Sequence, residues 1–125
     1  MDISLPTRPV VFSSQIEERA GEAAQLLRLL ANENRLLVLC HLSTEGEVTV
    51  GRLAEMVGLS QPAISQHLAK LRADGLVATR RAATSIHYRV ADPRVERLLL
   101  TLRDIFCSPE EISPAGEDQR PLGGE

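Results

Sequence analysis

The chain has 125 residues and a net charge of −3, with 43% hydrophobic and 25% charged residues. These values are typical of one globular domain and exclude a membrane-spanning chain, because no apolar run is long enough to cross a bilayer. Residues 1–9 lack the basic and apolar segments of a signal peptide, so we expect a cytoplasmic protein.

The charge is unevenly distributed along the chain. Residues 108–125 carry five acidic side chains against one arginine, whereas residues 52–97 carry eight arginines and lysines against four acidic side chains. A locally basic surface can meet a phosphate backbone even when the whole chain is acidic. The net charge therefore does not exclude a nucleic acid partner.

The first half of the chain predicts two helices behind an arm. Residues 1–14 contain two prolines and no hydrophobic periodicity, and we expect a flexible N-terminal arm there. An apolar stripe at helical spacing runs from Ile16 to Leu30. Asn32 is a good N-cap for a second helix, Glu33–Ser43, whose mostly apolar side chains predict that it is largely buried.

The second half predicts a short helix, a turn, a longer helix, a hairpin and a final helix. The helices are expected over Val50–Val57 and Gln61–Arg72, with Ser60 as the N-cap of the latter and Gly75 just beyond its end. Two strands, Val77–Arg81 and Ser85–Val90, flank a hairpin tip at residues 82–84. Asp92-Pro93 opens the last helix, which ends before Ser108-Pro109.

This order of elements predicts a mainly α fold with a small β-hairpin, the winged helix-turn-helix. We expect the DNA-binding and dimerisation domain to span residues 15–107, followed by a disordered acidic tail over residues 108–125. In such folds a helix enters the major groove of DNA and reads base edges with polar side chains.

Candidate DNA contacts lie on the Gln61–Arg72 helix and on the hairpin. On the helix, Gln66 suits the edge of an adenine and Lys70 suits a phosphate, while an amphipathic surface helix with no DNA role is the plain alternative. A basic hairpin beside such a helix is typical of a wing that grips the neighbouring DNA backbone. The candidate residues are Ser60, Gln61, Ser65, Gln66, Lys70, Arg80, Arg81, Thr84 and Ser85.

Four segments of the chain resemble the ArsR/SmtB family of bacterial repressors. They are residues 29–39 (LLANENRLLVL), 57–72 (VGLSQPAISQHLAKLR), 75–77 (GLV) and 87–90 (HYRV). The resemblance covers about residues 16–107. It implies a homodimer built on the first and last helices, whose repression is relieved by a chemical inducer. With one recognition helix in each protomer, we expect such a dimer to bind an inverted repeat in double-stranded operator DNA.

Many members of that family sense metals, but the two common metal sites do not match this chain. There is no Cys-x-Cys pair, and residues 92–107 contain no histidine, so we expect no metal site and no cofactor. The chain does contain Cys40 and Cys107. In their placement they resemble the subgroup of the family that senses persulfides, sulfide and other oxidants by linking two thiols within one protomer.

Two other interpretations remain open from the sequence, and two more are disfavoured. Cys40 could be a small core residue, since free cysteine is commonly buried. Cys40 and Cys107, with or without His41, could form an unusual metal site in a metal-responsive repressor. A thiol enzyme or a protein-binding winged helix is disfavoured, because the chain has no Cys-x-x-Cys, phosphate-binding loop or acid/base pair, and because its hairpin is basic.

Overall fold

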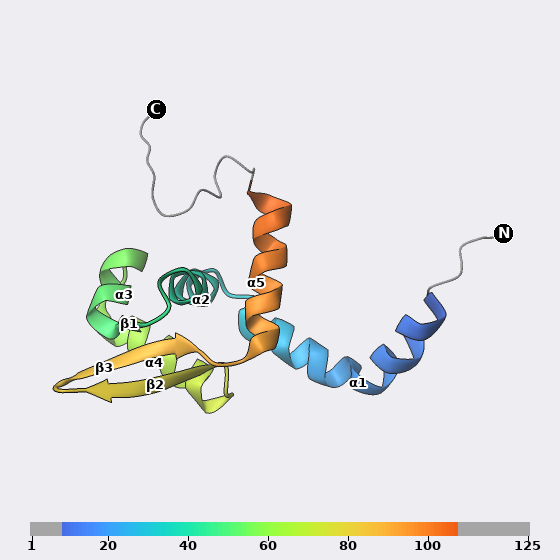
Figure 1. Cartoon of the computed structure of the whole chain (residues 1–125), viewed down its shortest axis with the longest axis horizontal. Helices are drawn as coiled ribbons and strands as arrows, with labels where there is room; N and C mark the ends of the chain where they lie inside the picture. The colour runs from blue at the N-terminus through green and yellow to red at the C-terminus, as the bar shows by residue number, and fades with distance from the viewer. Residues whose placement is uncertain (1–8, 108–125) are drawn as a thin grey trace.

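The computed structural model describes residues 9–107, and their side chains from residue 15 onward. Five helices and the β-hairpin follow one another in the predicted order, with one further short strand between α2 and α3 (Figure 1). The fold is a winged helix-turn-helix, as predicted. The elements are α1 (Pro9–Leu30), α2 (Glu33–Glu45), β1 (Val48–Thr49), α3 (Val50–Val57), α4 (Gln61–Ala73), β2 (Val77–Ala82), β3 (Ser85–Val90) and α5 (Pro93–Phe106).

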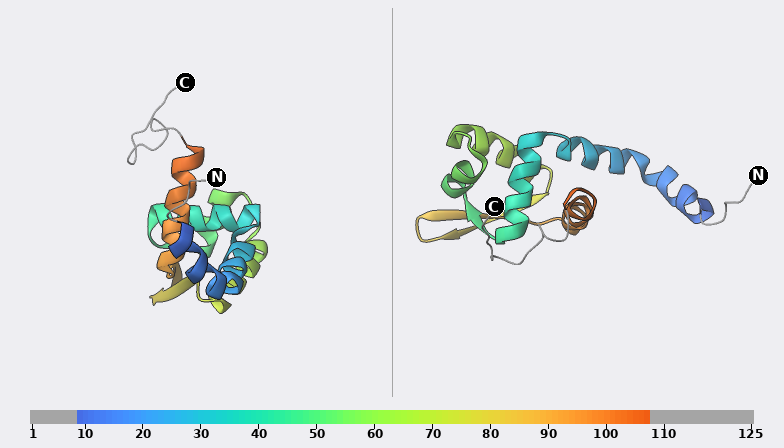
Figure 2. Two further views of the ribbon diagram at one scale, coloured as in Figure 1. Left: turned by 90° about the vertical axis from the view of Figure 1, so that its right-hand side faces the viewer. Right: turned by 90° about the horizontal axis from the view of Figure 1, so that it is seen from above.

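Helix α1 is longer than the hydrophobic stripe indicates. It begins at Pro9, although the sequence predicts a helix from Ile16 behind an arm that ends at residue 14. A proline in the first helical turn costs no hydrogen bond, so Pro9 is compatible with this start. The helix bends at Arg19, where φ is −114° and ψ is 15°, and it extends away from the other elements (Figure 2). The expected arm at residues 1–8 and the expected tail at residues 108–125 lie outside the described residues.

Local capping chemistry sets the helix boundaries as the sequence predicts. The Asn32 side chain accepts a hydrogen bond from the Arg35 backbone N–H at 3.1 Å, and Ser60 accepts one from Ala63 at 3.2 Å. After α4, Gly75 has φ of +79° and the Leu76 N–H donates to the Leu71 carbonyl at 2.9 Å. This closing bond is the Schellman arrangement, in which glycine supplies the left-handed residue.

One apolar core unites all the elements. Its members come from α1 (Leu26, Leu29, Leu30), α2 (Val38, Leu39, Leu42), β1 (Val48), α3 (Leu53, Ala54), α4 (Ile64, Leu68, Leu71), the start of the hairpin (Leu76, Val77) and α5 (Val95, Leu99). Leu, Val, Ile and Ala build it, as the low aromatic content predicts. No helix among the described residues is long and apolar enough to cross a membrane.

The sheet has three antiparallel strands in the order β1-β3-β2. The sequence predicts the hairpin of β2 and β3 but not β1, which pairs Val48 with Tyr88 and Thr49 with His87. Ala82 pairs with Ser85, so the hairpin tip is Ala83-Thr84, one residue shorter than expected. Ala83 has φ of +56°, a conformation that a tight hairpin requires of its first tip residue.

Candidate DNA-binding surface and thiol groove

Helices α3 and α4 form the helix-turn-helix, and buried leucines and isoleucine determine which face of α4 is exposed. Gly58, with φ of +83°, ends α3, and Ser60 caps α4 two residues later. The side chains of Ile64, Leu68 and Leu71 are completely buried under α4. Since these residues recur at helical spacing, the opposite face of α4 points to solvent.

The candidate DNA contacts on α4 all lie on its exposed side. Ser60, Gln61, Ser65, Gln66 and Lys70 are exposed, as the helical spacing predicts. Two of these side chains have other partners within the chain. The Ser60 hydroxyl caps the helix, and the Lys70 ammonium lies 3.4 Å from the Asp74 carboxylate. The surface is therefore polar and fixed on a fully packed base, which is the arrangement that groove-reading helices use.

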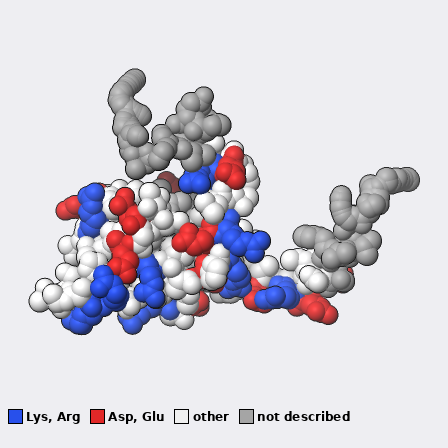
Figure 3. All heavy atoms as spheres, in the orientation of Figure 1, with Lys and Arg blue, Asp and Glu red and all other residues white. Residues whose placement is uncertain are grey.

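The hairpin places its candidate residues at the tip and on both faces. Thr84 and Ser85 are exposed at the turn. Arg80 and Arg81 are also exposed, and because they are consecutive strand residues they point to opposite faces of the hairpin. Figure 3 shows basic side chains along the lower edge of this part of the molecule, with acidic side chains beside them.

Glu47 is a residue of this surface that the sequence does not single out. Its carboxylate accepts two hydrogen bonds from Arg80 Nε, each at 3.1 Å, and one from Arg80 Nη2 at 2.7 Å. The hydrogen bonds from Arg80 lower the pKa of Glu47, with further lowering by the charges of Arg80, His87 and Arg89. The two residues are 33 positions apart, so only the pairing of β1 with β3 and of β3 with β2 brings them together.

Cys40 and Cys107 line one groove between α2 and α5. The groove has a volume of about 400 Å³, within the range of small-molecule sites. Leu36, Ser43 and Thr44 of α2 line it with Cys40, and Leu99, Leu100, Leu102, Arg103 and Phe106 of α5 line it with Cys107. The two thiols are far apart in the sequence, and the fold brings them to the same mainly apolar cleft.

The exposure of Cys40 differs from what its helix suggests. The sequence predicts that α2 is largely buried, but Cys40 is exposed and Leu37 is 39% exposed. Val38, Leu39 and Leu42 are completely buried instead, because α2 packs on the core with one side only. Cys40 is thus a surface thiol and not a core residue.

The two thiols differ in their surroundings. Partial burial among apolar side chains raises the pKa of Cys40, and the nearby charge of ionised Cys107 raises it further. Cys107 ends α5, where its backbone N–H donates to the Arg103 carbonyl at 2.9 Å. A thiol with a raised pKa holds less thiolate at neutral pH and attacks electrophiles more slowly. The Cys40 thiol therefore holds less thiolate at neutral pH than an unperturbed cysteine does.

Within residues 9–107, no three side chains of the His, Cys, Asp and Glu types converge on a point that could hold a metal ion. His41, His67 and His87 lie on α2, α4 and β3. His67 is partly buried, and loss of hydration, with the charge of Arg35, lowers its pKa. It packs beside the inward face of α4, as its position predicts.

Comparison with known proteins gives consistent results. Residues 32–79 match the family described as "Bacterial regulatory protein, arsR family". The chain is 41% identical over 105 residues to the biofilm growth-associated repressor of Xylella fastidiosa, covering 84% of this chain and 91% of that protein. It is 39% identical to the transcriptional activator HlyU of Vibrio cholerae, covering 78% and 89% of the two chains.

Solved structures of relatives have the same fold. The transcriptional repressor BigR of Xylella fastidiosa superimposes with a TM-score of 0.72 at 41% identity, over 77% of this chain and 97% of that one. The reduced form of HlyU from Vibrio cholerae superimposes with a TM-score of 0.69 at 40% identity, over 75% and 98%.

Proposed function

This chain belongs to the arsR family of bacterial regulatory proteins, and on that premise we propose that it is a homodimeric repressor whose release from DNA is triggered at Cys40 and Cys107. Its fold and relatives make it a DNA-binding transcriptional regulator and not an enzyme. The observation that carries the proposed trigger is that both thiols line one groove, on elements other than the exposed polar surface of α4 and the wing.

In this proposal α4 enters the major groove of operator DNA. Gln66 pairs with a base edge there, since an amide can bond an adenine at two points. Lys70 and the wing meet phosphates, which positions the protein without reading sequence. The proposed DNA contacts are Ser60, Gln61, Ser65, Gln66, Lys70, Arg80, Arg81, Thr84 and Ser85.

A second copy of the chain covers the exposed apolar side chains of α1 and α5. Leu27 is 56% exposed, and at the end of α5 Ile105 and Phe106 are 65% and 78% exposed. Two adjacent large apolar side chains this exposed, at the end of α5, are typical of an interface. The two α4 helices of such a dimer would read an inverted repeat whose half-sites lie about one helical turn apart.

The proposed inducer is a reactive sulfur species, such as a persulfide RSSH, and it acts by linking the two thiols within one protomer. One thiolate attacks the outer sulfur of RSSH and RSH leaves. Two persulfide molecules and the two thiols then give a trisulfide bridge, two molecules of RSH and one of H₂S. A direct disulfide needs Cα atoms within about 7 Å, whereas a chain of sulfur atoms spans a wider gap.

The bridge would change DNA affinity through α5. Tethering the end of α5 to α2 moves the apolar side chains that we assign to the dimer interface. The spacing of the two α4 helices depends on that interface, and both must fit successive major grooves. The coupling needed is of the usual allosteric size, about 1–3 kcal/mol. A redox role is also supported by the relative HlyU, because a structure of its reduced form has been solved.

The decisive experiment combines intact-mass spectrometry with DNA binding after treatment with glutathione persulfide, hydrogen peroxide or zinc. We expect a bridge within one protomer and loss of operator binding after persulfide treatment. Cys40→Ser and Cys107→Ser should each keep DNA binding and lose the response. The same proteins on a promoter fusion distinguish repression from activation, because a repressor lowers the reporter signal.

Four outcomes would contradict parts of this proposal. Release of DNA by either single cysteine variant after persulfide treatment would exclude the proposed trigger. A bridge between protomers would exclude it as well. Stoichiometric zinc binding that releases the reduced protein from DNA would favour a metal-responsive repressor with an atypical site. A monomer in sedimentation, with no footprint on genomic DNA, would exclude the dimeric repressor.

A further inference from the structure

The guanidinium of Arg80 on the wing is held by a carboxylate from outside the hairpin. Glu47 directly precedes β1, and it accepts three hydrogen bonds from Arg80, of 2.7, 3.1 and 3.1 Å. Two different nitrogens of the guanidinium are engaged, so the contact has the forked geometry that arginine also uses with phosphate. The side chain therefore already has the kind of partner that a DNA backbone would offer.

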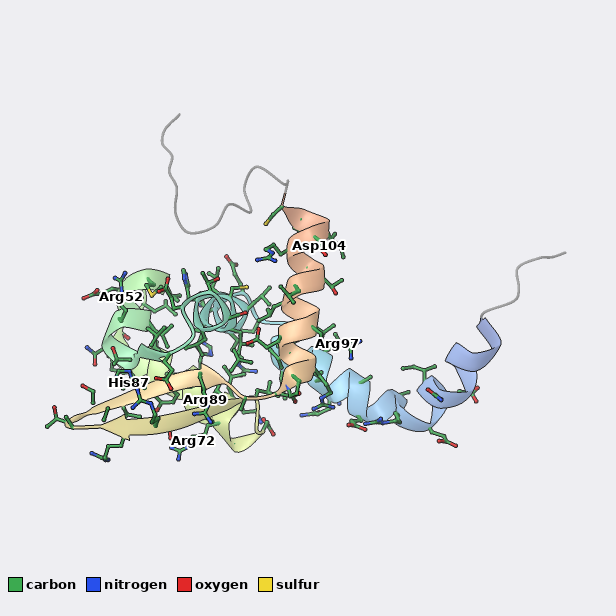
Figure 4. All side chains as sticks on the ribbon, viewed as in Figure 1. Arg52, Arg72, His87, Arg89, Arg97 and Asp104 are labelled. Carbon is green, nitrogen blue, oxygen red and sulfur yellow. The ribbon has the colours of Figure 1, made fainter. Side chains whose placement is uncertain are left out.

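Glu47 lies among basic side chains on one face of the sheet. Arg80 pairs with His87 across the strands, and Arg89 follows two residues later on β3, so the three side chains share that face. Figure 4 shows His87 and Arg89 over the sheet. The hydrogen bonds from Arg80 lower the pKa of Glu47, and the charges of Arg80 and Arg89 lower it further, which fits a carboxylate that stays ionised beside two guanidinium groups.

Arg81 provides the internal contrast. It pairs with Ile86 and points to the other face of the hairpin from Arg80. Among residues 15–107, no carboxylate forms an ion pair with Arg81, although both arginines are exposed. Two consecutive arginines of the wing thus differ in whether their charge is already neutralised.

We propose that Glu47 acts as an internal substitute for a DNA phosphate, which occupies Arg80 and limits how strongly the wing binds DNA of any sequence. This inference rests on the proposed DNA binding, takes Arg80 out of the proposed phosphate contacts, and adds Glu47 as a residue that controls the strength of binding. A phosphate can take the Nε/Nη2 fork of Arg80 only by displacing the Glu47 carboxylate. The exchange replaces one forked anion contact by another, and it leaves an ionised carboxylate beside the phosphate, so Arg80 adds little to affinity.

Weak binding to arbitrary DNA has a physical use in a regulator. A genome offers a very large number of competing sites, so the ratio of operator affinity to non-specific affinity determines occupancy. Phosphate contacts supply nearly all of the free energy of non-specific binding, and each basic side chain that contacts a phosphate strengthens that binding. Neutralising Arg80 on the protein removes one such contact from every site.

The test measures binding of the full chain to a random-sequence DNA duplex over a series of salt concentrations. The proteins are wild type, Glu47→Gln, Arg80→Gln and the double variant. We expect Glu47→Gln to bind several-fold more tightly at low salt, and its plot of log affinity against log salt to be steeper by about 0.9. We expect Arg80→Gln to bind more weakly, because it leaves Glu47 unpaired, and the double variant to match wild type.

The double variant decides the question. If Arg80 already grips a phosphate in the wild-type complex, removing both residues lowers affinity and flattens the salt dependence by about 0.9, which overturns the proposal. This comparison stands even if Glu47→Gln alone is poorly folded, since the double variant lacks both partners of an exposed pair.

Asp104→Asn is the matched control for net charge. Asp104 is exposed on α5, far from the wing in Figure 4, and the substitution changes the net charge as Glu47→Gln does. Asp104→Asn should leave the salt dependence of DNA binding unchanged. If it raised DNA affinity as much as Glu47→Gln does, the local role of Glu47 would be overturned. Failure of the wild-type chain to bind any duplex would overturn the proposed function as well, whereas a wrong order among binding variants overturns only this inference.

Discussion

The DNA-binding unit and the α2–α5 groove present opposite kinds of surface. On α4, completely buried residues such as Ile64 and Leu68 support an exposed face of polar side chains. At the groove, the exposed side chains are largely apolar, with Leu100 and Phe106 46% and 78% exposed beside two thiols. A polar surface is stable in water and suits a polyanion, whereas an exposed apolar surface requires a cover. The contrast separates the surface to which we assign DNA binding from the groove to which we assign control.

Helix α2 belongs to both regions. Leu39 and Leu42 are completely buried in the core that also supports α4, while Cys40 lies on the groove side. Ser43 donates a hydrogen bond of 2.7 Å to the Glu96 carboxylate, which ties α2 to α5. A displacement of α5 therefore acts on a helix that also packs under the DNA-binding unit.

The largest expected effect is on the free energy of unfolding, and it compares a buried and an exposed residue of α5. Leu99→Ala removes a side chain that is 6% exposed in the core, and it should lower the free energy of unfolding by about 2–5 kcal/mol. Phe106→Ala, at the exposed end of the same helix, should leave the unfolding of the monomer nearly unchanged and weaken self-association. Urea titrations at several protein concentrations, with sedimentation, separate the two effects. An equal loss of monomer stability in both variants would show that the exposed end of α5 supports the fold as much as its buried part does.

A smaller effect is expected at the exposed face of α4. Gln66→Ala should weaken operator binding by about 1–3 kcal/mol and relax the preference at one base pair, because one amide contact to a base edge is lost. Thermal unfolding and the cysteine response should not change, since the side chain is exposed. Gln25→Ala on α1 is the control, and it should leave operator affinity intact. A change in cysteine bridging in Gln66→Ala would show that the two regions are not separate.

The smallest effect concerns the ion pairs that attach α1 to the start of α5. Arg94 lies 2.8 Å from Glu22 and 2.7 Å from Asp92. Hydrogen bonds from Arg19 and then Arg94 lower the pKa of Glu22, and hydrogen bonds from Arg94 lower that of Asp92. A carboxyl with a depressed pKa stabilises the fold above its unfolded pKa, and this stabilisation is lost as pH falls through the folded pKa.

Arg94→Gln should therefore reduce stability slightly at neutral pH and converge with wild type in acid. Exposed pairs contribute little, so the difference is expected to be near the limit of a careful urea titration. Urea unfolding curves of wild type and Arg94→Gln, recorded at a series of pH values from neutral to acidic, measure this difference. A gap that widens in acid would mean that Arg94 acts through packing and not through its charge.

The sequence predicts those parts of the fold that depend on nearby residues. The caps at Asn32 and Ser60 were predictable because each joins residues three positions apart, and the exposed face of α4 follows from helical spacing. Strand β1 was not predictable, since two residues carry no periodicity and the strand exists only through its pairing with β3.

The candidate sites divide in the same way. The exposure of Gln66 follows from its position on one helix, but the contact between Glu47 and Arg80 depends on how three strands align. For Cys40, the apolar residues around most of α2 predict burial, and only the position of α5 determines which side remains open. Residues that touch distant segments are thus the ones that local patterns miss.

The exposed face of α4 has a consequence for how such regulators diverge. Its outward side chains contribute little to the core, and substitutions at exposed positions usually change stability by less than about 0.5 kcal/mol. Mutation can therefore alter the DNA sequence that is read, one side chain at a time, without passing through unfolded intermediates. On the proposed binding mode, new operator preferences are accessible to this scaffold by single steps, whereas truncating a buried residue of the same helix such as Leu68 costs about 2–5 kcal/mol.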